Sequence, residues 1–238
     1  MLKKGSDVRS DRYTFLFAAA VCIVCSVLLA VAASSLKPLQ EFNVSIDRKT
    51  NILKALGLYD QKSGQLPAYE IEKIFSQRIM EKAMDAMGNE VAIDLRGEKR
   101  EGGYLPYYVR SDNNSIAIPI EGMGLWSLLQ GYLALESDGR TVKGLTFYEH
   151  KETPGLGAEI EEDWFTGNFV GKDILNKAGE LVSITAVRGK AGEYAGQDLD
   201  NLVDGISGAS MTVRGVNDLL LAGLKDYEQY LKRLWKDR

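Results

Sequence analysis

The stretch from Tyr13 to Ala33 contains no charged residue, and this limits where the chain can fold. At helical rise, its length matches the hydrocarbon core of a bilayer, so we predict one transmembrane helix over residues 13–34. A cleavable signal peptide is the alternative, because Ala30, Val31 and Ala32 resemble a small-residue cleavage site. The apolar run is longer than the usual core of a signal peptide, which favours a retained anchor.

Basic residues are concentrated before this stretch and are sparse after it, where Lys37 stands almost alone. The preceding basic residues are Lys3, Lys4, Arg9 and Arg12. Because cytoplasmic flanks carry the excess of Lys and Arg, residues 1–12 are predicted to lie in the cytoplasm. The sequence therefore predicts a single-pass membrane protein whose large C-terminal part lies outside the cytoplasm.

The composition excludes several kinds of protein. With 238 residues, the chain is long enough for one substantial domain in addition to the anchor. Its net charge of −4 argues against nucleic-acid binding. Cys22 and Cys25 both fall inside the apolar run, so the domain has no disulfide framework. We interpret them as packing residues of the membrane helix, and a metal shared with a partner subunit is the alternative.

Residues 35–88 are predicted to be helical, because apolar residues recur there at steps of three and four. A first helix leaves the membrane after Pro38 and ends at Gly57, and a second covers Ala68 to Met87. Beyond Asn89 the period changes to alternation, which predicts a short strand through Val91, Ile93 and Leu95.

Residues 89–238 are predicted to form one domain rich in antiparallel strands. Turn-forming residues separate two pairs of strands, 104–109 with 116–120 and 131–136 with 142–148. A short helical segment around Trp164 and Phe165 precedes a last strand at 181–187, and an amphipathic helix begins near Thr212 and runs to Leu234. Few strands alternate with helices, so we predict a mostly antiparallel α+β fold.

The stretch before the C-terminal helix, from Asp204 to Thr212, combines two glycines with three hydroxyl residues. The first turn of a helix has N–H groups without intrahelical partners and the positive end of the helix dipole, so it stabilises a bound anion. The candidate anion-binding residues are Ser207, Gly208, Ala209, Ser210, Met211 and Thr212. Taken alone, the same residues are explained by a Ser/Thr helix cap after a glycine turn.

Two earlier loops, from Gly122 to Trp126 and from His150 to Gly157, have a composition suited to a planar ligand. Trp126 and Leu156 offer apolar surface, while Thr153 and the backbone around Gly157 offer polar contacts to a ring edge. Each residue also has an ordinary explanation, since a single tryptophan is usually a core residue and Thr-Pro-Gly is a turn.

In chain order, the three stretches resemble the motifs G-x-G-L-W, E-T-P-G-L-G and D-x-x-S-G-A-T-x-T of the covalent FMN-binding domain family. The resemblance implies FMN held as a phosphoester on Ser210, where family members have threonine far more often. It extends over most of the chain. It further implies an electron-transfer subunit of a sodium-translocating NADH:quinone oxidoreductase in a bacterial inner membrane, with the domain on the periplasmic side. The implied partners are the other subunits of that complex and a flavin transferase, and the chain is not expected to be catalytic alone.

Two alternatives stay open. The equivalent subunit of a ferredoxin:NAD electron-transport complex shares the motif and the anchor. Ser210 in place of threonine also allows a flavin-free structural subunit.

Other chemistries fit the sequence less well. His150 is the only histidine and no G-x-S-x-G elbow precedes a helix, which argues against a hydrolase. No dinucleotide fingerprint or P-loop is present, so the chain itself is not expected to bind NADH or ATP. The acidic residues in 159–163 are interpreted as a solvated helix start.

Overall fold

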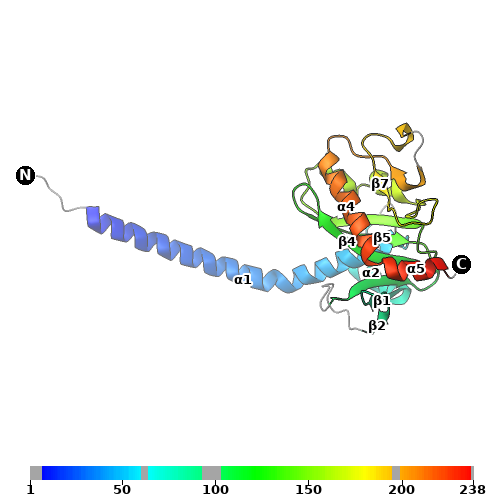
Figure 1. The fold of residues 1–238 in the computed structure, drawn as a ribbon. Coiled ribbons are helices and arrows are strands. Elements are labelled where there is room, and N and C mark those ends of the chain that lie inside the picture. Colours follow the sequence, from blue (N-terminus) through cyan, green and yellow to red (C-terminus); the bar gives the residue numbers. More distant parts are fainter. Residues whose placement is uncertain (1–6, 60–63, 93–102, 195–198, 237–238) are drawn as a thin grey trace, which may run out of the picture. The chain divides into compact units, whose positions relative to one another are not determined.

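The computed structural model describes residues 7–59, 64–92, 103–194 and 199–236. The chain divides into two compact units, Met1–Ser45 and Ile46–Arg238. The second unit is an α+β domain built on an antiparallel sheet, as the sequence predicts (Figure 1). The predicted boundary at residue 88 does not coincide with this division, since residues 46–88 belong to the same unit as the sheet.

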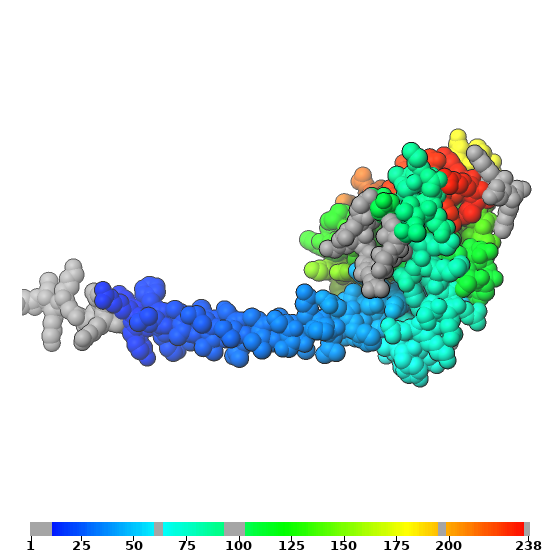
Figure 2. Space-filling view, turned by 90° about the horizontal axis from the view of Figure 1, so that it is seen from below, coloured from blue at the N-terminus to red at the C-terminus, as the bar shows by residue number. Residues whose placement is uncertain are grey.

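The first unit consists of a single helix. Helix α1 runs from Asp7 to Ala55 and continues through Pro38. In the space-filling view its first part is a rod one helix wide (Figure 2), and residues 11–44 are exposed throughout. Among the described residues, α1 is the one helix whose length and apolar composition suffice to cross a membrane. Apolar side chains on all sides of a helix are typical of contact with lipid.

Helix α1 ends in a glycine turn, as predicted. Gly57 has a φ of 67°, a left-handed conformation that favours glycine. Its N–H donates to the carbonyl of Lys54 at 2.9 Å, and the N–H of Leu58 donates to that of Leu53 at 2.8 Å. These two bonds form a Schellman motif, which satisfies carbonyls left without partners at the helix end.

The predicted second helix is too long. Helix α2 covers Ala68–Arg78, and the chain then continues directly as strand β1, Ile79–Met84. The apolar spacing through Ile79, Ala83 and Met87 fits a helix. However, β1 pairs along its length with residues 105–110, from Ile79 opposite Arg110 to Met84 opposite Leu105. Pairing with distant residues therefore overrides the local helical pattern.

Six strands form the main sheet in the order β2-β1-β3-β4-β5-β6, and every neighbouring pair is antiparallel. The strands not yet given are β2 Glu90–Val91, β3 Leu105–Arg110, β4 Ile116–Met123, β5 Leu128–Leu135 and β6 Val142–Glu149. Both predicted hairpins are confirmed, as β3–β4 and β5–β6. Of the strand predicted through Val91, Ile93 and Leu95, only Val91 lies within the described residues.

The C-terminal part differs from the prediction in two places. The last predicted strand, 181–187, is reduced to β7, Thr185–Ala186, because Ser183 has a φ of 67° that interrupts an extended chain. Strand β7 pairs in parallel with β8, Leu202–Val203. The final predicted helix is broken at Tyr227 into two helices. The remaining helices are α3 Asp163–Thr166, α4 Ser210–Asp226, α5 Glu228–Lys236 and 3₁₀ turns at Gly157–Glu161, Gly167–Phe169, Ala191–Glu193 and Leu199–Asn201.

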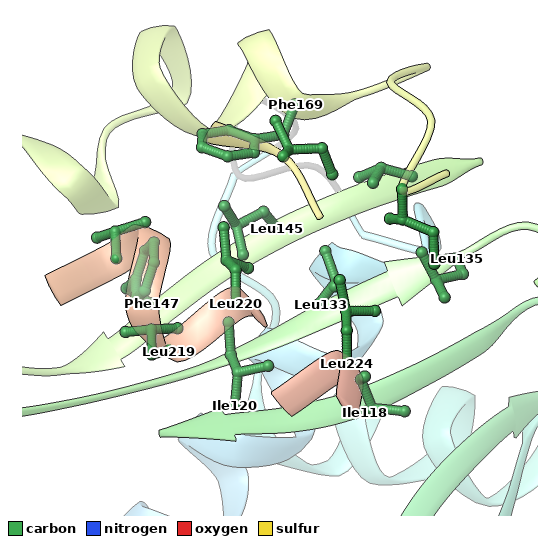
Figure 3. Packing of buried hydrophobic residues seen from close by; sticks show 14 of the residues in the cluster. Ile118, Ile120, Leu133, Leu135, Leu145, Phe147, Phe169, Leu219, Leu220 and Leu224 are labelled. Carbon is green, nitrogen blue, oxygen red and sulfur yellow. The ribbon is translucent and has the colours of Figure 1, made fainter. Parts of the chain in front are cut away.

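Helix α4 packs directly on the sheet. Its residues Leu219, Leu220 and Leu224 lie against inward residues of β4 and β5, such as Ile120 and Leu133 (Figure 3). A Cβ on Gly122 of β4 would lie 2.6 Å from the Cβ of Leu219, so glycine is required for this close approach. Each fully buried leucine contributes about 1.5–3 kcal/mol. This packing fixes where α4 begins relative to the end of β4.

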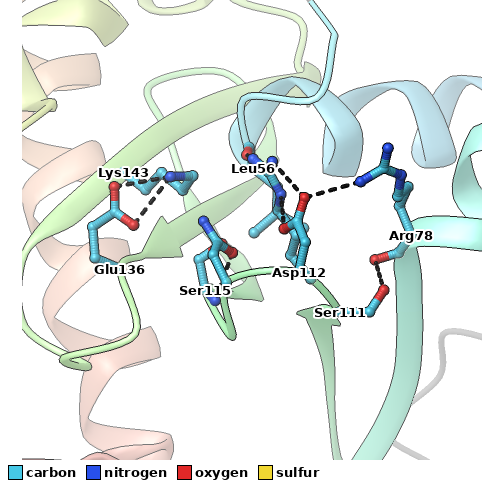
Figure 4. A network of polar contacts seen from close by, with 9 residues as sticks. Leu56, Arg78, Ser111, Asp112, Ser115, Glu136 and Lys143 are labelled. Atoms are coloured by element: carbon cyan, nitrogen blue, oxygen red, sulfur yellow. Dashed lines mark hydrogen bonds and ion pairs between the residues drawn. The ribbon is translucent and has the colours of Figure 1, made fainter.

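The opposite face of the sheet is covered by the end of α1 and by α2. Leu53 and Phe75 belong there to a second core with Tyr108 and Tyr132. Polar contacts join the same elements: Asp112, in the β3–β4 turn, accepts hydrogen bonds from Arg110 at 2.6 and 2.9 Å (Figure 4). It also accepts one from Arg78 at 3.1 Å, and Arg110 donates to the carbonyl of Leu56 at 3.0 Å. The last turns of α1 are thus part of the domain.

Candidate functional site

The two glycine-rich loops and the stretch before α4 meet at a cleft of about 820 Å³. This volume is in the range of cofactor pockets. Residues 152–153, 156–157 and 204–212 line the cleft, together with 188–190 from the segment after β7. Two apolar side chains, Leu125 and Trp164, complete its wall.

Helix α4 begins at this cleft with its first turn open. Its N-cap residue is Ala209, and among the described residues no side chain makes a capping hydrogen bond there. The interpretation of the serines as ordinary helix caps is therefore wrong. Ser207 and Ser210 are both exposed, and Ser210 is the first residue of the helix. The N–H groups of this turn lack intrahelical acceptors and can bind an anion.

Glycines bring the loops into contact. Gly208 has a φ of 78°, and a Cβ there would lie 2.9 Å from Cδ2 of Leu156. A Cβ on Gly157 would lie 2.6 Å from the hydroxyl of Thr212. The loop from His150 to Gly157 therefore lies directly against the stretch that carries Ser210, and larger residues at these glycines would separate the two.

Glu152 connects all three loops, a role that its own motif does not indicate. Its side chain is 5% exposed. One carboxylate oxygen accepts the backbone N–H of Trp126 at 2.9 Å, and the other accepts the hydroxyl of Thr212 at 2.6 Å. Gly124 leaves space for this carboxylate, since a Cβ there would lie 2.6 Å from Oε1. Nothing in the local sequence marks Glu152 as buried, because its partners come from distant loops.

Thr212 is held inside the protein. Its side chain is 1% exposed and donates its hydroxyl proton to Glu152. Ser207 and Ser210 are the exposed hydroxyl groups of this stretch. The three hydroxyls that compete on sequence grounds are thus distinguished by burial and by hydrogen bonding.

Of the residues predicted to contact the ring of a planar ligand, some line the cleft and one does not. Leu156 and Thr153 line the cleft, and the carbonyl of Thr153 accepts N–H groups of Leu156 and Ala158 at 3.1 Å, which fixes the turn. Trp126 is 67% exposed and is not one of the residues lining the cleft. Its neighbour Leu125 occupies the wall instead. A core role for Trp126 is therefore wrong as well.

Two cationic side chains, Arg188 and Lys190, were not expected at the site. Both are exposed and both line the cleft. The carboxylate of Asp204 accepts the N–H of Ala191 at 2.8 Å and so joins the segment of these cations to the stretch that carries Ser210. The Arg-Gly-Lys sequence before an anion-binding motif is a signal that could have indicated these cations.

The comparisons with known proteins agree with this geometry. A family model described as an FMN-binding domain matches residues 124–225, a range that contains all the residues lining the cleft. NqrC, the C subunit of the Na(+)-translocating NADH-quinone reductase, is 33% identical in Neisseria meningitidis serogroup B and is matched over 98% of both chains. The same protein of Pseudomonas aeruginosa is 33% identical over 97% of this chain and 98% of that protein.

Solved structures show the same fold. The corresponding protein from Parabacteroides distasonis superposes with a TM-score of 0.70 and 31% identity, covering 82% of this chain and 96% of the other. The apolar helix α1 and these similarities indicate a membrane-associated protein that contains an FMN-binding domain. The chain belongs to the NqrC family, the C subunits of the Na(+)-translocating NADH-quinone reductase.

Proposed function

We propose that this chain is the FMN-carrying electron-transfer subunit of a sodium-translocating NADH:quinone oxidoreductase, with FMN joined through its phosphate to the hydroxyl of Ser210. The observation that carries the proposal is the setting of Ser210. Its side chain is exposed in the first turn of α4, at a cleft that all three motif loops line or adjoin. The hydroxyl of Thr212 is buried against Glu152 and is not accessible to an attaching enzyme.

The residues of the cleft fit an FMN. The open first turn of α4 offers N–H donors to the phosphate, and glycines at 205 and 208 allow the backbone to approach it. Leu125, Leu156 and Trp164 provide apolar surface for the ring system. Bound FMN supplies the redox chemistry, while these residues fix its position and its surroundings.

Attachment requires a flavin transferase and an activated flavin phosphate. A bond forms between Oγ of Ser210 and phosphorus, the bond from phosphorus to the leaving group of the donor breaks, and the hydroxyl proton is removed. Exposure of Ser210 gives the transferase access to this atom. A covalent bond also keeps the cofactor on a carrier that lies outside the cytoplasm.

The remaining steps belong to partner subunits. The resemblance to the family assigns NADH oxidation, quinone reduction and ion movement to those subunits. The sequence of this chain contains no dinucleotide fingerprint, which agrees with NADH binding elsewhere. The excess of Lys and Arg before residue 13 directs the N-terminus to the cytoplasm and residues 46–238 to the other side of the membrane. Residues 13–34 form the membrane-spanning part of α1.

The attachment is tested by expressing the chain with a competent flavin transferase. Intact mass and flavin fluorescence in a denaturing gel report a covalent FMN. Ser210→Ala should be dark, and Ser210→Thr should keep the label because the hydroxyl is retained. Fluorescence that persists in Ser210→Ala would place the ester elsewhere. An unaltered chain that carries no label would favour the flavin-free structural subunit.

Topology is tested separately. Protease added to spheroplasts should digest the domain after Lys37. Protection of the domain, or a mature N-terminus near Ala33, would contradict an uncleaved anchor with an external domain.

A further inference from the structure

The segment of residues 187–191, here named the basic loop, carries Arg188 and Lys190 into the cleft that contains Ser210. The loop follows strand β7, and the stretch that carries Ser210 follows strand β8. Because β7 and β8 pair in parallel, the two chains leave the pair side by side and in the same direction. The two cations therefore reach the same side of the cleft as the start of α4.

Hydrogen bonds hold the basic loop along most of its length. The N–H of Val187 donates to the carbonyl of Val203 at 2.9 Å, and the N–H of Gly205 donates to that of Gly189 at 2.9 Å. The carboxylate of Asp204 accepts the N–H of Ala191 at 2.8 Å. Of these bonds, the one to Asp204 is made by a side chain, and a substitution can remove it.

The basic loop also lies in close contact with Gly205 and is joined to helix α4. A Cβ on Gly205 would lie 2.0 Å from the carbonyl oxygen of Val187, so the two backbones touch at this point. The amide of Asn217, on α4, binds both the N–H and the carbonyl of Ala186 at 2.8 and 2.9 Å. Asn217 thereby fixes the start of the basic loop to the helix that begins with Ser210.

The charged residues that line the cleft indicate what this arrangement of the basic loop does. The two carboxylates that line the cleft, Glu152 and Asp204, accept hydrogen bonds from protein donors. A phosphate near Ser210 adds further negative charge beside them. Among the described residues that line the cleft, Arg188 and Lys190 are the cations that offset it.

We propose that Arg188 and Lys190 bind the flavin phosphate and that Asp204 is a positioning residue, which acts by holding the basic loop through the N–H of Ala191. Asp204 does not touch the phosphate in this arrangement. The proposal rests on the proposed function, because it takes the phosphate to lie at Ser210. It explains why an acidic residue stands shortly before an anion site, where its own charge is unfavourable.

The test uses the full chain in detergent, prepared without a flavin transferase, and titrates it with FMN and with riboflavin. The two probes share the ring system and differ by the phosphate, so the ratio of their dissociation constants isolates the phosphate contacts. The unaltered chain should prefer FMN. The double variant Arg188→Ala/Lys190→Ala should lose about tenfold in FMN affinity, the effect of two partly screened ion pairs, with riboflavin affinity unchanged.

Asp204 is tested with two substitutions. Asp204→Ala removes the acceptor for Ala191 and should reduce the FMN preference, although it also removes a negative charge from the cleft. Asp204→Asn keeps an acceptor oxygen and should retain the preference. If Asp204 acted by charge alone, both variants would bind FMN more tightly than the unaltered chain, which would overturn its positioning role.

A matched control removes two cations elsewhere. Lys73→Ala/Lys225→Ala alters exposed lysines on α2 and at the far end of α4, and it should leave the FMN preference intact. An equal loss in this control, or no preference in the unaltered chain, would overturn the phosphate-binding role of the basic loop. Intact mass after treatment with a transferase tests the attachment at Ser210 independently, so the two proposals can fail separately.

Discussion

Replacing Glu152 should destabilise the domain more than any substitution of an exposed acidic residue. The side chain is buried and accepts two hydrogen bonds, from the N–H of Trp126 at 2.9 Å and from the hydroxyl of Thr212 at 2.6 Å. A hydrogen bond to a charged group contributes about 1.5–3 kcal/mol, and a buried donor left without a partner costs a similar amount. Glu152→Ala should therefore lower the free energy of unfolding by about 3–5 kcal/mol.

Two further variants separate hydrogen bonding from charge. In Glu152→Gln the amide oxygen can accept from Trp126 while its NH₂ donates to the hydroxyl of Thr212, so the loss should be about 1–2 kcal/mol. Thr212→Val removes the donor. Because the two side chains bond each other, the loss in Glu152→Ala/Thr212→Val should fall short of the sum of the single losses by about 1–2 kcal/mol.

Urea unfolding of the full chain in detergent, followed by tryptophan fluorescence, measures these differences. Asp218→Asn is the control, since Asp218 is exposed and its contact with Arg214 is 4.0 Å long. It should change the free energy of unfolding by about 0.5 kcal/mol or less. If Glu152→Ala is as mild as this control, Glu152 does not hold the three loops together.

Three other perturbations test the fold. Gly208→Ala should cost about 1–2 kcal/mol in urea unfolding and should slow flavin attachment, because a Cβ at a φ of 78° also contacts Leu156. Hydrogen bonds from Arg110 lower the pKa of Asp112 in the folded protein. The stability that this carboxylate contributes is therefore fully present above the ordinary pKa of aspartate, and it is lost as the pH falls through the lowered pKa of the folded state. Asp112→Asn should consequently flatten the decline of the unfolding free energy below about pH 4, measured by urea unfolding across pH. Removing residues 1–45 should leave a soluble domain that unfolds cooperatively. Removing residues 1–58 should abolish folding, because it deletes the buried Leu53 and Leu56. Circular dichroism measures both outcomes.

The hairpins were predictable from sequence and strand β1 was not, for a physical reason. The β5–β6 turn contains Asp138-Gly139, and Gly139 has the positive φ, 66°, that such turns need, so the signal is local. Strand β1 has apolar residues at helical steps and few β-branched ones. Its conformation is determined by pairing with β3, which follows β2 in the chain. The residues of β1 alone carry no signal of this pairing.

The candidate site shows the same division. Ser210, Leu156 and Thr153 were found because they belong to contiguous motifs, and all three line the cleft. Glu152 and Arg188 were missed, because their roles depend on which distant segment lies beside them. The exposed position of Trp126 could not be predicted for the same reason. Its loop is fixed by the hydrogen bond from the backbone N–H of Trp126 to Glu152, and the chemistry of the indole side chain does not determine that bond.

The two hydroxyl positions at the start of α4 place different demands on their side chains. Thr212 is enclosed, so its methyl group fills space while its hydroxyl donates to Glu152; serine there would leave a void beside a buried carboxylate. Ser210 is exposed, so a methyl group at that position would fill no buried space. An ester on Ser210 needs the hydroxyl and access to it, both of which serine provides. The replacement of the family's threonine by serine therefore removes nothing on which the proposed attachment depends.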